Sequence, residues 1–535
     1  MTTKLLMQIL YMVEKMDNLN IDIDQKQETR RTANVISLML PARMYEFECS
    51  WTTEQPLPAM EEFSCRLLLM LGTIHPNDLQ NYFGLNNQER EVLLNSLFEK
   101  RLAVINTDGS IKPSSLLQAK SANGTNLVPS LTVFEERQEK AQFDLLSLQL
   151  LWKNNYSGTK WGLPEIEADS ALMKASQDQI CEAFSRQYRA HLENTRQSLH
   201  EAQKTRLYKI GQCQQQHTLQ IPIDMVINLE PIRDHDVRII RDVSQKIGEI
   251  RKFSLSNELE AKIADYLGKL KVSDEGMSIE KFCELFGDEV LARYVSDNRF
   301  DLSAWLLDRD HKKTGYGNQN TRALLGPVYL KNNRIEIERW LKNFSAGSED
   351  KKVERIYWLP ANVPLWAASG SDLTEFIAKI DNVLKKSDDS HEGLVTLFPT
   401  KINDDHFNLR KNSFSPRLPH GIALYNASPL DRVELMVFQG LFAIAQYHLQ
   451  PNKTSGITIP IGFITSDPDR MARIENVLKE RLKTVSNYNL MWSRDKRNLD
   501  DLLDIDYLQI ANKNHNHPQS QEPLPLITYK KKTNL

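Results

Sequence analysis

The sequence predicts a multidomain protein that combines α and α/β regions. A chain of 535 residues is too long for one hydrophobic core, and at about 150 residues per domain it divides into three or four domains. The hydrophobic share of 41% and the charged share of 26% are typical of a folded chain. Helical spacing of apolar residues prevails up to residue 345, and strands alternate with helices after it. We therefore expect an N-terminal module, a mainly helical middle region and a C-terminal α/β sheet domain.

The composition restricts the partners and the compartment. The chain has 67 Lys and Arg against 70 Asp and Glu, so any nucleic acid must bind a local cluster of cations. Its five cysteines include no C-x-x-C pair, which is typical of reduced thiols and predicts a cytoplasmic location. The apolar run from Val433 to Ala445 is interrupted by Glu434 and Gln439 and is shorter than the ~20 residues that cross a bilayer. No membrane contact is predicted.

Residues 1–57 form the first predicted segment. Its apolar run, Leu5 to Val13, is followed by charged residues instead of a cleavage site, which predicts an amphipathic helix and not a signal peptide. Strand-like runs follow at Val35 to Leu40 and Met44 to Trp51. The segment ends at the proline pair of Gln55-Pro56-Leu57-Pro58.

Residues 58–120 form a second segment, in which three helices precede a hairpin. The Asp-Gly turn at Asp108 joins two short β-prone runs, Ala103 to Asn106 and Ser110 to Lys112. The predicted helices are Glu61 to Leu71, Asn77 to Phe83 and Asn87 to Leu102. Over residues 58–118 this order resembles the winged helix-turn-helix superfamily. The resemblance implies that the third helix enters the major groove of DNA.

The exposed face of that third helix is acidic. Leu93, Leu94 and Leu97 face the core, whereas Glu89 and Glu91 point outward. Carboxylates are repelled by phosphates at close range. We therefore interpret the module as a protein-docking or structural element, with DNA contact as the alternative.

Residues 130–345 are predicted to be mainly helical. The Gln- and Glu-rich stretch from Ala171 to Lys209 predicts a long, partly exposed helix. The stretch from Asp234 to Leu270 predicts a second helix, since its apolar residues recur every three or four positions. These residues are Val237, Ile240, Val243, Ile247 and Ile250.

Residues 349–510 are predicted to form the α/β domain, and residues 511–535 a flexible tail without periodicity. The predicted strands are 355–359, 394–398, 422–425, 433–438 and 457–465, and the predicted helices are 372–386, 440–449 and 468–484.

A basic segment runs from Asp308 to Lys342. It holds eight Lys or Arg against four acids, and at its centre a glycine-bearing loop, His311 to Arg322, offers cations, amides and an aromatic ring. These groups suit phosphate and stacking contacts with nucleic acid, although a solvated linker is the alternative. The predicted nucleic-acid-binding residues are Arg309, Lys312, Lys313, Tyr316, Arg322, Lys331 and Arg334.

Motifs of common enzymes are absent from the sequence. It has no G-x4-G-K-[ST], H-E-x-x-H or G-x-S-x-G, and its Cys and His residues lack the paired spacing of a zinc site. No metal or cofactor is predicted. The weak catalytic candidates are His406, His420 and Asp467, which lie between or after predicted strands. A helix cap is the preferred explanation of Asp467, because Pro468 follows it at the first turn of a predicted helix.

The leading hypothesis is a non-catalytic, nucleic-acid-associated adaptor or scaffold subunit of a prokaryotic multiprotein system. The order of its segments resembles accessory subunits of bacterial genome-defence systems. That resemblance implies other protein subunits as partners, and DNA or RNA as a further partner. The alternative is a divergent nuclease or hydrolase whose site lies in the C-terminal α/β domain.

Overall fold

The computed structural model describes thirteen stretches of the chain, which form two compact units. They are residues 30–122, 130–152, 162–195, 199–232, 236–247, 251–273, 276–347, 355–385, 393–400, 406–425, 430–483, 485 and 487–508. Unit 1 comprises residues 1–40, 158–166 and 222–535, and unit 2 comprises residues 41–157 and 167–221. The predicted N-terminal helix and the predicted tail lie outside the described residues. Among the described helices, none is both long enough and apolar enough to cross a membrane.

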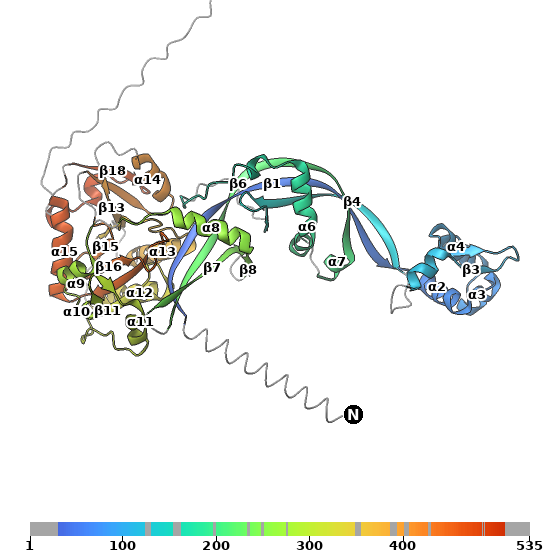
Figure 1. The fold of residues 1–535 in the computed structure, drawn as a ribbon, viewed down its shortest axis with the longest axis horizontal. Helices are drawn as coiled ribbons and strands as arrows, with labels where there is room; N and C mark the ends of the chain where they lie inside the picture. The colour runs from blue at the N-terminus through green and yellow to red at the C-terminus, as the bar shows by residue number, and fades with distance from the viewer. Residues whose placement is uncertain are drawn as a thin grey trace, which may run out of the picture. The chain divides into compact units, whose positions relative to one another are not determined.

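Unit 2 contains the module of helices and a hairpin that the sequence predicts (Figure 1). We call residues 57–122 the N-terminal module. Its helices are α2 (Ala59–Leu71), α3 (Pro76–Phe83), α4 (Asn87–Glu99) and α5 (Ser115–Ala122), and its hairpin joins β2 (Ala103–Ile105) to β3 (Ile111–Pro113). Local signals explain these bounds, because Gly84 ends α3 in a left-handed conformation and Asn86 forms a capping box with Glu89 at the start of α4. The predicted helices and hairpin are confirmed.

A six-stranded sheet has the order β5-β4-β1-β6-β7-β8. Its strands are β1 (Arg31–Pro56), β4 (Ser130–Asp144), β5 (Leu150–Leu151), β6 (Thr205–Pro231), β7 (Val237–Ile247) and β8 (Arg251–Ser254). In unit 2, helix α6 (Gln177–Thr195) packs on this sheet through Phe184, whose ring stacks on Phe47 at 4.3 Å between centroids. A 3-10 turn, η1 (Leu172–Lys174), precedes α6, and α7 (Leu199–Lys204) follows it.

The prediction of a mainly helical region over residues 130–345 is wrong, because β4, β6, β7 and β8 lie within it. The apolar residues from Val237 to Ile247 have helical spacing by chance and belong to β7, which pairs with β6 antiparallel. The predicted helix over Ala171 to Lys209 is confirmed only in α6 and α7, and Thr205 already begins β6. The backbone N–H and C=O groups of these strands form hydrogen bonds with partner strands elsewhere in the sheet. A local sequence pattern cannot predict this pairing.

Unit 1 is built on an eight-stranded mixed sheet of order β11-β17-β16-β15-β12-β13-β14-β18. Strands β12, β13 and β14 are parallel, and the other pairs are antiparallel. The strands are β11 (Thr321–Leu325), β12 (Ile356–Leu359), β13 (Leu394–Thr400), β14 (His420–Tyr425), β15 (Val433–Phe438), β16 (Phe442–Leu449), β17 (Ile459–Thr465) and β18 (Asn487–Ser493). The mixed α/β class is confirmed.

Helices and turns accompany this sheet in unit 1. The helices are α8 (Asn257–Lys269), α9 (Ile279–Phe286), α10 (Glu289–Ala292), α11 (Leu302–Asp310), α12 (Lys331–Gly347), α13 (Ser371–Lys385), α14 (His406–Phe414), α15 (Pro468–Lys483), α16 (Leu499–Leu502) and α17 (Ile505–Leu508). The short strands β9 (Val295–Ser296) and β10 (Arg299–Phe300) form a separate ribbon.

Both faces of the sheet are buried. Along β15, Leu435 and Val437 belong to a core with residues of α9, α11 and α15, whereas Met436 and Phe438 belong to a core with residues of α12 and α13. The unit therefore has helices on both sides of one sheet (Figure 1).

The prediction of a helix over 440–449 is wrong. Phe442–Leu449 is strand β16, which returns from β15 through a tight turn at Gly440, where φ is +74°. A strand buried on both faces has a continuous apolar run without alternation, so periodicity does not separate it from a buried helix.

We expect Leu435→Ala to lower the free energy of unfolding of unit 1 by about 2–5 kcal/mol. Leu435 is fully buried at the centre of the sheet, so its removal leaves a cavity that helices on that face cannot fill. Urea unfolding followed by tryptophan fluorescence measures the loss. A loss below about 1 kcal/mol, within the usual range of surface substitutions, would contradict this packing.

Candidate functional site

Two of the predicted nucleic-acid-binding cations interact with neighbouring groups in the protein. The Arg309 guanidinium lies over the Trp305 ring at 5.4 Å and donates a hydrogen bond to the Ala323 carbonyl at 3.2 Å. Lys313 lies 3.4 Å from the carboxylate of Asp308. These contacts within the protein weaken the attraction of each cation for a phosphate.

Arg334 and Arg322 are also held by acids. Arg334 is buried, and its guanidinium lies 2.8 Å from Glu375 and 3.6 Å from Asp372. Arg322 is 3.2 Å from Glu336. Arg334 is thus a structural residue that joins α12 to α13 and is not a surface contact.

Lys312 and Lys331 are exposed, and neither has an ion-pair partner among the described residues. Lys312 has a φ of +57° directly after α11. Among the predicted contact residues, these two cations are exposed without an ion pair, whereas Lys313 and Arg322 are exposed but paired with acids.

Tyr316 anchors the predicted binding loop to the protein interior. Its hydroxyl donates to the Asp288 carboxylate, at 3.0 Å from either oxygen, and the Arg470 guanidinium lies 4.8 Å from the ring centroid. Burial raises the pKa of Asp288 to about 6, against lowering contributions from the Leu291 N–H and the Tyr316 hydroxyl. The ring of Tyr316 is therefore engaged by Arg470 and Phe463 and does not offer a free face to a base.

His420 and Asp467, the two predicted catalytic residues whose side chains are described, do not form an acid–base pair. His420 is buried at the start of β14, where Nδ1 lies 3.1 Å from Ser493 Oγ and burial lowers the pKa of the imidazole to about 4. Asp467 accepts a hydrogen bond from the Arg470 backbone N–H and so caps α15. It follows β17, five strand positions from β14, or about 24 Å at the usual strand spacing. The side chain of His406 lies outside the described residues.

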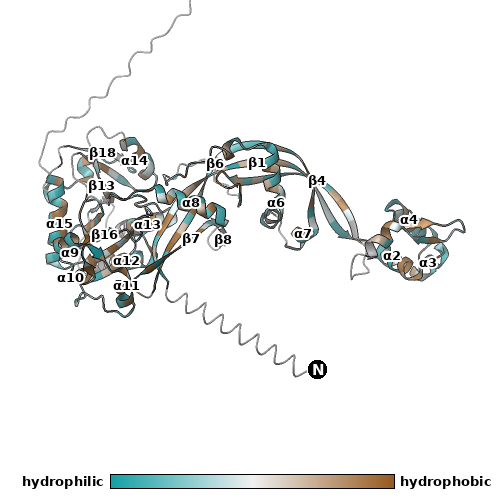
Figure 2. Ribbon diagram, viewed as in Figure 1, coloured by the Kyte–Doolittle hydropathy of each residue, from teal (hydrophilic) through white to brown (hydrophobic). Residues whose placement is uncertain are grey.

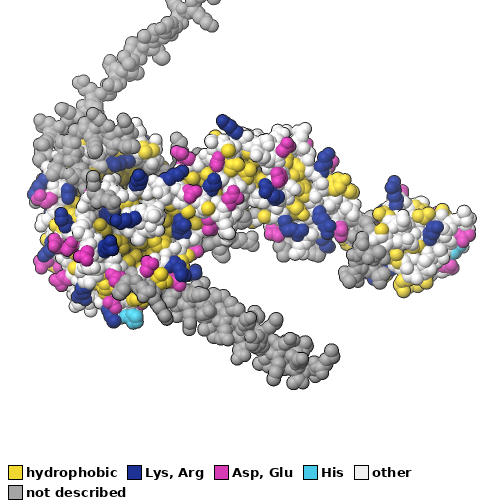
Figure 3. Space-filling model, viewed as in Figure 1, with side chains coloured by type: hydrophobic (Ala, Val, Ile, Leu, Met, Phe, Trp, Pro, Cys, Tyr) yellow, Lys and Arg dark blue, Asp and Glu magenta, His cyan; other side chains and the backbone are white. Residues whose placement is uncertain are grey.

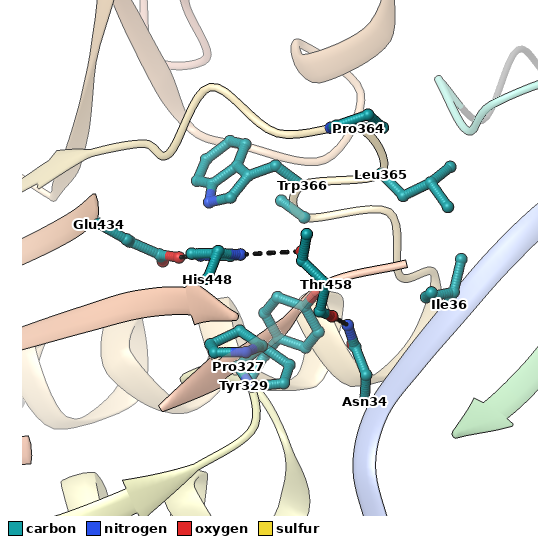
Figure 4. Close-up of a pocket in the computed structure, with 12 residues that line it drawn as sticks. Asn34, Ile36, Pro327, Tyr329, Pro364, Leu365, Trp366, Glu434, His448 and Thr458 are labelled. Atoms are coloured by element: carbon teal, nitrogen blue, oxygen red, sulfur yellow. Dashed lines mark hydrogen bonds and ion pairs between the residues drawn. The ribbon is translucent and has the colours of Figure 1, made fainter. Parts of the chain in front are cut away.

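The structure reveals a different polar cluster, formed by Glu434 on β15, His448 on β16 and Thr458 just before β17 (Figure 4). His448 Nε2 lies 2.6 Å from Glu434 Oε2, and His448 Nδ1 lies 3.2 Å from Thr458 Oγ1. All three side chains are buried. With a proton on Nε2 only, the His448 ring would donate a hydrogen bond to the carboxylate and accept one from the Thr458 hydroxyl.

Partners on all sides hold the cluster in place. The Trp358 indole N–H donates to the other oxygen of Glu434 at 2.7 Å, and the Asn34 amide donates to the Thr458 carbonyl at 2.9 Å. A cavity of about 10 Å³ adjoins the cluster, enough for about one water molecule. The ring of Trp366 also lines this cavity.

The loop that carries Trp366 is strained. Leu365 and Ala367 have φ values of +59° and +51°, which residues other than glycine rarely adopt. Strain of this kind costs on the order of 1–3 kcal/mol per residue and persists where the surroundings hold it. The sequence offered one signal for this site, namely Glu434 and His448 as charged or polar residues inside apolar strands.

The surface of the N-terminal module is apolar and acidic. The described chain has sixteen exposed large hydrophobic residues, and nine of them lie between Met60 and Leu116. Figure 2 shows hydrophobic positions on the helices of this module, and Figure 3 shows hydrophobic side chains on its visible face. On α4, Glu89 and Glu91 are exposed, and Arg90 is bound by Glu91, Asn77 and Gln80.

No group of three or more His, Cys, Asp or Glu in the described parts of the chain is placed to hold a metal ion. Four of the five cysteines are buried, and burial raises the pKa of Cys65 to about 12, which suppresses the reactive thiolate. We therefore assign no metal centre or reactive thiol.

Asp288→Asn should remove a pH dependence from the stability of unit 1. The pKa of Asp288 in the folded state, about 6, exceeds its ordinary value of 3.8. The folded state therefore gains stability as the pH falls through 6 and loses it as the pH rises, by about 3 kcal/mol in all. Urea unfolding between pH 4 and 7 should show this slope in the wild type and not in the variant. Asp297→Asn, at an exposed position, is the control, and equal slopes in all three proteins would contradict the assignment.

Comparison with known proteins assigns no family. No known protein family matches the chain, and no curated protein does. One solved structure with some similarity is that of TrmBL2, described as an archaeal chromatin protein with a novel mode of DNA binding. The two chains are 10% identical, the similarity covers 80% of this chain and 94% of the other, and the TM-score is 0.20. A score this low does not establish a common fold, and no property of TrmBL2 is carried over.

Proposed function

We propose that the protein is an adaptor subunit that binds other protein subunits through its N-terminal module, a winged-helix-like domain. The concentration of exposed hydrophobic side chains on this module carries the proposal. Nine of the sixteen in the described chain lie on it, although it comprises only residues 57–122. A soluble monomer rarely exposes extensive apolar patches, and such patches commonly mark protein interaction sites.

The charge of the module also supports a protein partner. In a winged-helix domain, helix α4 would correspond to the DNA-reading helix, yet its exposed side chains include Glu89, Glu91 and Glu99. Its one arginine, Arg90, is engaged by neighbours within the module. Contact with DNA phosphates would therefore bring carboxylates against anions, which is unfavourable.

The hypothesis of an accessory subunit in a prokaryotic genome-defence system is part of this proposal. Under this hypothesis, the main partner is another protein subunit. DNA or RNA contact in the segment from Asp308 to Lys342 would depend most on Lys312 and Lys331, which are exposed cations of that segment without an ion-pair partner among the described residues.

A variant of the module surface tests the docking role. We expect Tyr82→Ser combined with Val92→Ser and Ile105→Ser to reduce the recovery of a native partner at least about tenfold, since a tenfold change needs only about 1.4 kcal/mol. All three side chains are exposed, so the fold should persist. Affinity purification from the native host with quantitative mass spectrometry measures recovery.

The matched control changes three exposed hydrophobic residues outside the module, Leu285, Ile335 and Leu409, to serine. The proposal requires that this control keeps the partner. Equal recovery with both variants would show that the module is not the docking surface.

Ester or acyl hydrolysis is a second candidate function, favoured by the hydrogen-bonded series of Glu434, His448 and Thr458. The three side chains are buried beside a cavity of about 10 Å³, so this function requires the loop that carries Trp366 to move and admit the substrate. A hydroxyl, an imidazole and a carboxylate in hydrogen-bonded series form the arrangement that activates a nucleophile. Thr458 Oγ1 would attack an acyl carbon while its proton passes to His448 Nδ1. That proton would then leave with the alcohol, and water would release the acid and restore the hydroxyl.

Thr458→Val and His448→Gln test this second candidate. With p-nitrophenyl acetate as the probe, we expect Thr458→Val to lose turnover and His448→Gln to lose about 10²–10⁴-fold, while Thr458→Ser retains it. An acetyl group on Thr458, found by peptide mass spectrometry, would be the direct evidence. Wild-type turnover no greater than that of Thr458→Val would leave the cluster as a structural network only.

A further inference from the structure

Four consecutive residues of the loop between β12 and α13 form one wall of the cavity beside the polar cluster. They are Pro364, Leu365, Trp366 and Ala367. The three of them that Figure 4 labels lie across the cavity from Pro327 and Tyr329. We call residues 362–370 the lid. A movement of the lid would open the cavity to a ligand.

The closed lid has several unfavourable features. Leu365 and Ala367 have φ values of +59° and +51°, so the backbone is strained on either side of Trp366. The Ser369 side chain is fully buried, and its hydroxyl has no hydrogen-bond partner among the described residues. Burial of a hydroxyl without a hydrogen bond is unfavourable. The closed conformation therefore needs groups that hold it in place.

Arg417 holds the lid from the protein interior. Its guanidinium donates hydrogen bonds to the carbonyl of Ala367 in the lid, to that of Gly162 at 2.8 Å and to that of Ser413 at 3.0 Å. Arg417 is buried, and no acid pairs with it in the described parts of the chain. Burial lowers the pKa of Arg417 to about 10, so the side chain stays charged at neutral pH. A charged donor forms a stronger hydrogen bond than a neutral one.

Two further contacts connect the lid to its surroundings. The Ser37 N–H, on β1, donates to the Ala368 carbonyl at 2.6 Å. The Trp366 ring packs edge-on against Trp358, with 4.9 Å between the centroids. Trp358 is the residue whose indole N–H donates to Glu434. The lid therefore contacts the polar cluster through these two tryptophans.

We propose that the lid opens by a local movement and that Arg417 is the latch that holds it closed over the polar cluster. The inference rests on the second candidate function, because an acyl substrate reaches Thr458 only when the lid is open. The closed cavity of about 10 Å³ holds about one water molecule and no substrate. Loops that close over a site in this way exclude water while the reaction proceeds.

Modification of His448 by diethyl pyrocarbonate tests the latch in the full-length chain, because the reagent reaches this buried imidazole only when the lid is open. Peptide mass spectrometry measures the rate, with the exposed His75 as the reference for reagent activity. We expect Arg417→Met to raise the rate at least about tenfold, since methionine occupies much of the same space but cannot donate to the Ala367 carbonyl.

Ala367→Gly should change the rate in the opposite direction. Glycine adopts a φ of +51° without steric strain, so this variant stabilises the closed lid and lowers the rate by about threefold or more. A variant that only loosened the fold would not slow the modification.

Leu478→Ala is the matched control for a general loss of stability. Leu478 is buried on α15 in the core on one face of the sheet, whereas Trp366 and Ala367 belong to the core on the other face. This variant should leave the rate at His448 nearly unchanged, and circular dichroism establishes that each variant is folded. The latch is excluded if Leu478→Ala raises the rate as much as Arg417→Met, or if neither lid variant changes it.

Turnover of p-nitrophenyl acetate separates failure of the latch from failure of the second candidate function. A wild type without turnover, in which Arg417→Met still raises the modification of His448, would keep the latch and exclude hydrolysis. Turnover that depends on Thr458, with equal modification of His448 in all variants, would keep hydrolysis and exclude the latch.

Discussion

The structure of unit 1 depends on one constraint, namely that buried charged side chains are paired with other groups inside the protein. Helices cover both faces of the eight-stranded sheet, so a polar side chain that enters the sheet must find its partner inside the protein. Glu434 meets this requirement through Trp358 and His448. Arg334 meets it through Asp372 and Glu375.

The same constraint pairs several cations of the basic segment with acids, and it buries Arg334. A count of residues between Asp308 and Lys342 finds an excess of cations, but the count does not include carboxylates that the fold brings from elsewhere. Asp372 and Glu375 come from α13, outside that segment. The Tyr316 hydroxyl likewise donates a hydrogen bond to the carboxylate of Asp288, which lies outside that segment.

The sequence predicted those elements whose signals are local. Gly84, the capping box of Asn86 and Glu89, and the Asp-Gly turn before Ser110 each act within a few residues, and the structure places helix and hairpin ends there. Strand β7 was missed because its identity depends on pairing with β6, and β16 was missed because burial on both faces erased its alternation.

The candidate sites were less predictable than the fold. His420 begins β14 and Asp467 follows β17, but the order of strands in the sheet, which sequence alone does not determine, separates them. Glu434 was noted only as an interruption of an apolar run. Its meaning depended on the register that sets β15 beside β16, the strand that carries His448.

The burial of Arg334 between two carboxylates also restricts how the sequence can change over evolution. Loss of both acids would leave the buried guanidinium of Arg334 without a counter-charge, which is unfavourable inside a protein. A relative that replaces Arg334 by an apolar residue is therefore expected to have replaced Asp372 and Glu375 as well. Correlated substitution at these three positions would mark chains that share the junction of α12 with α13, even where little else in the sequence is recognisable.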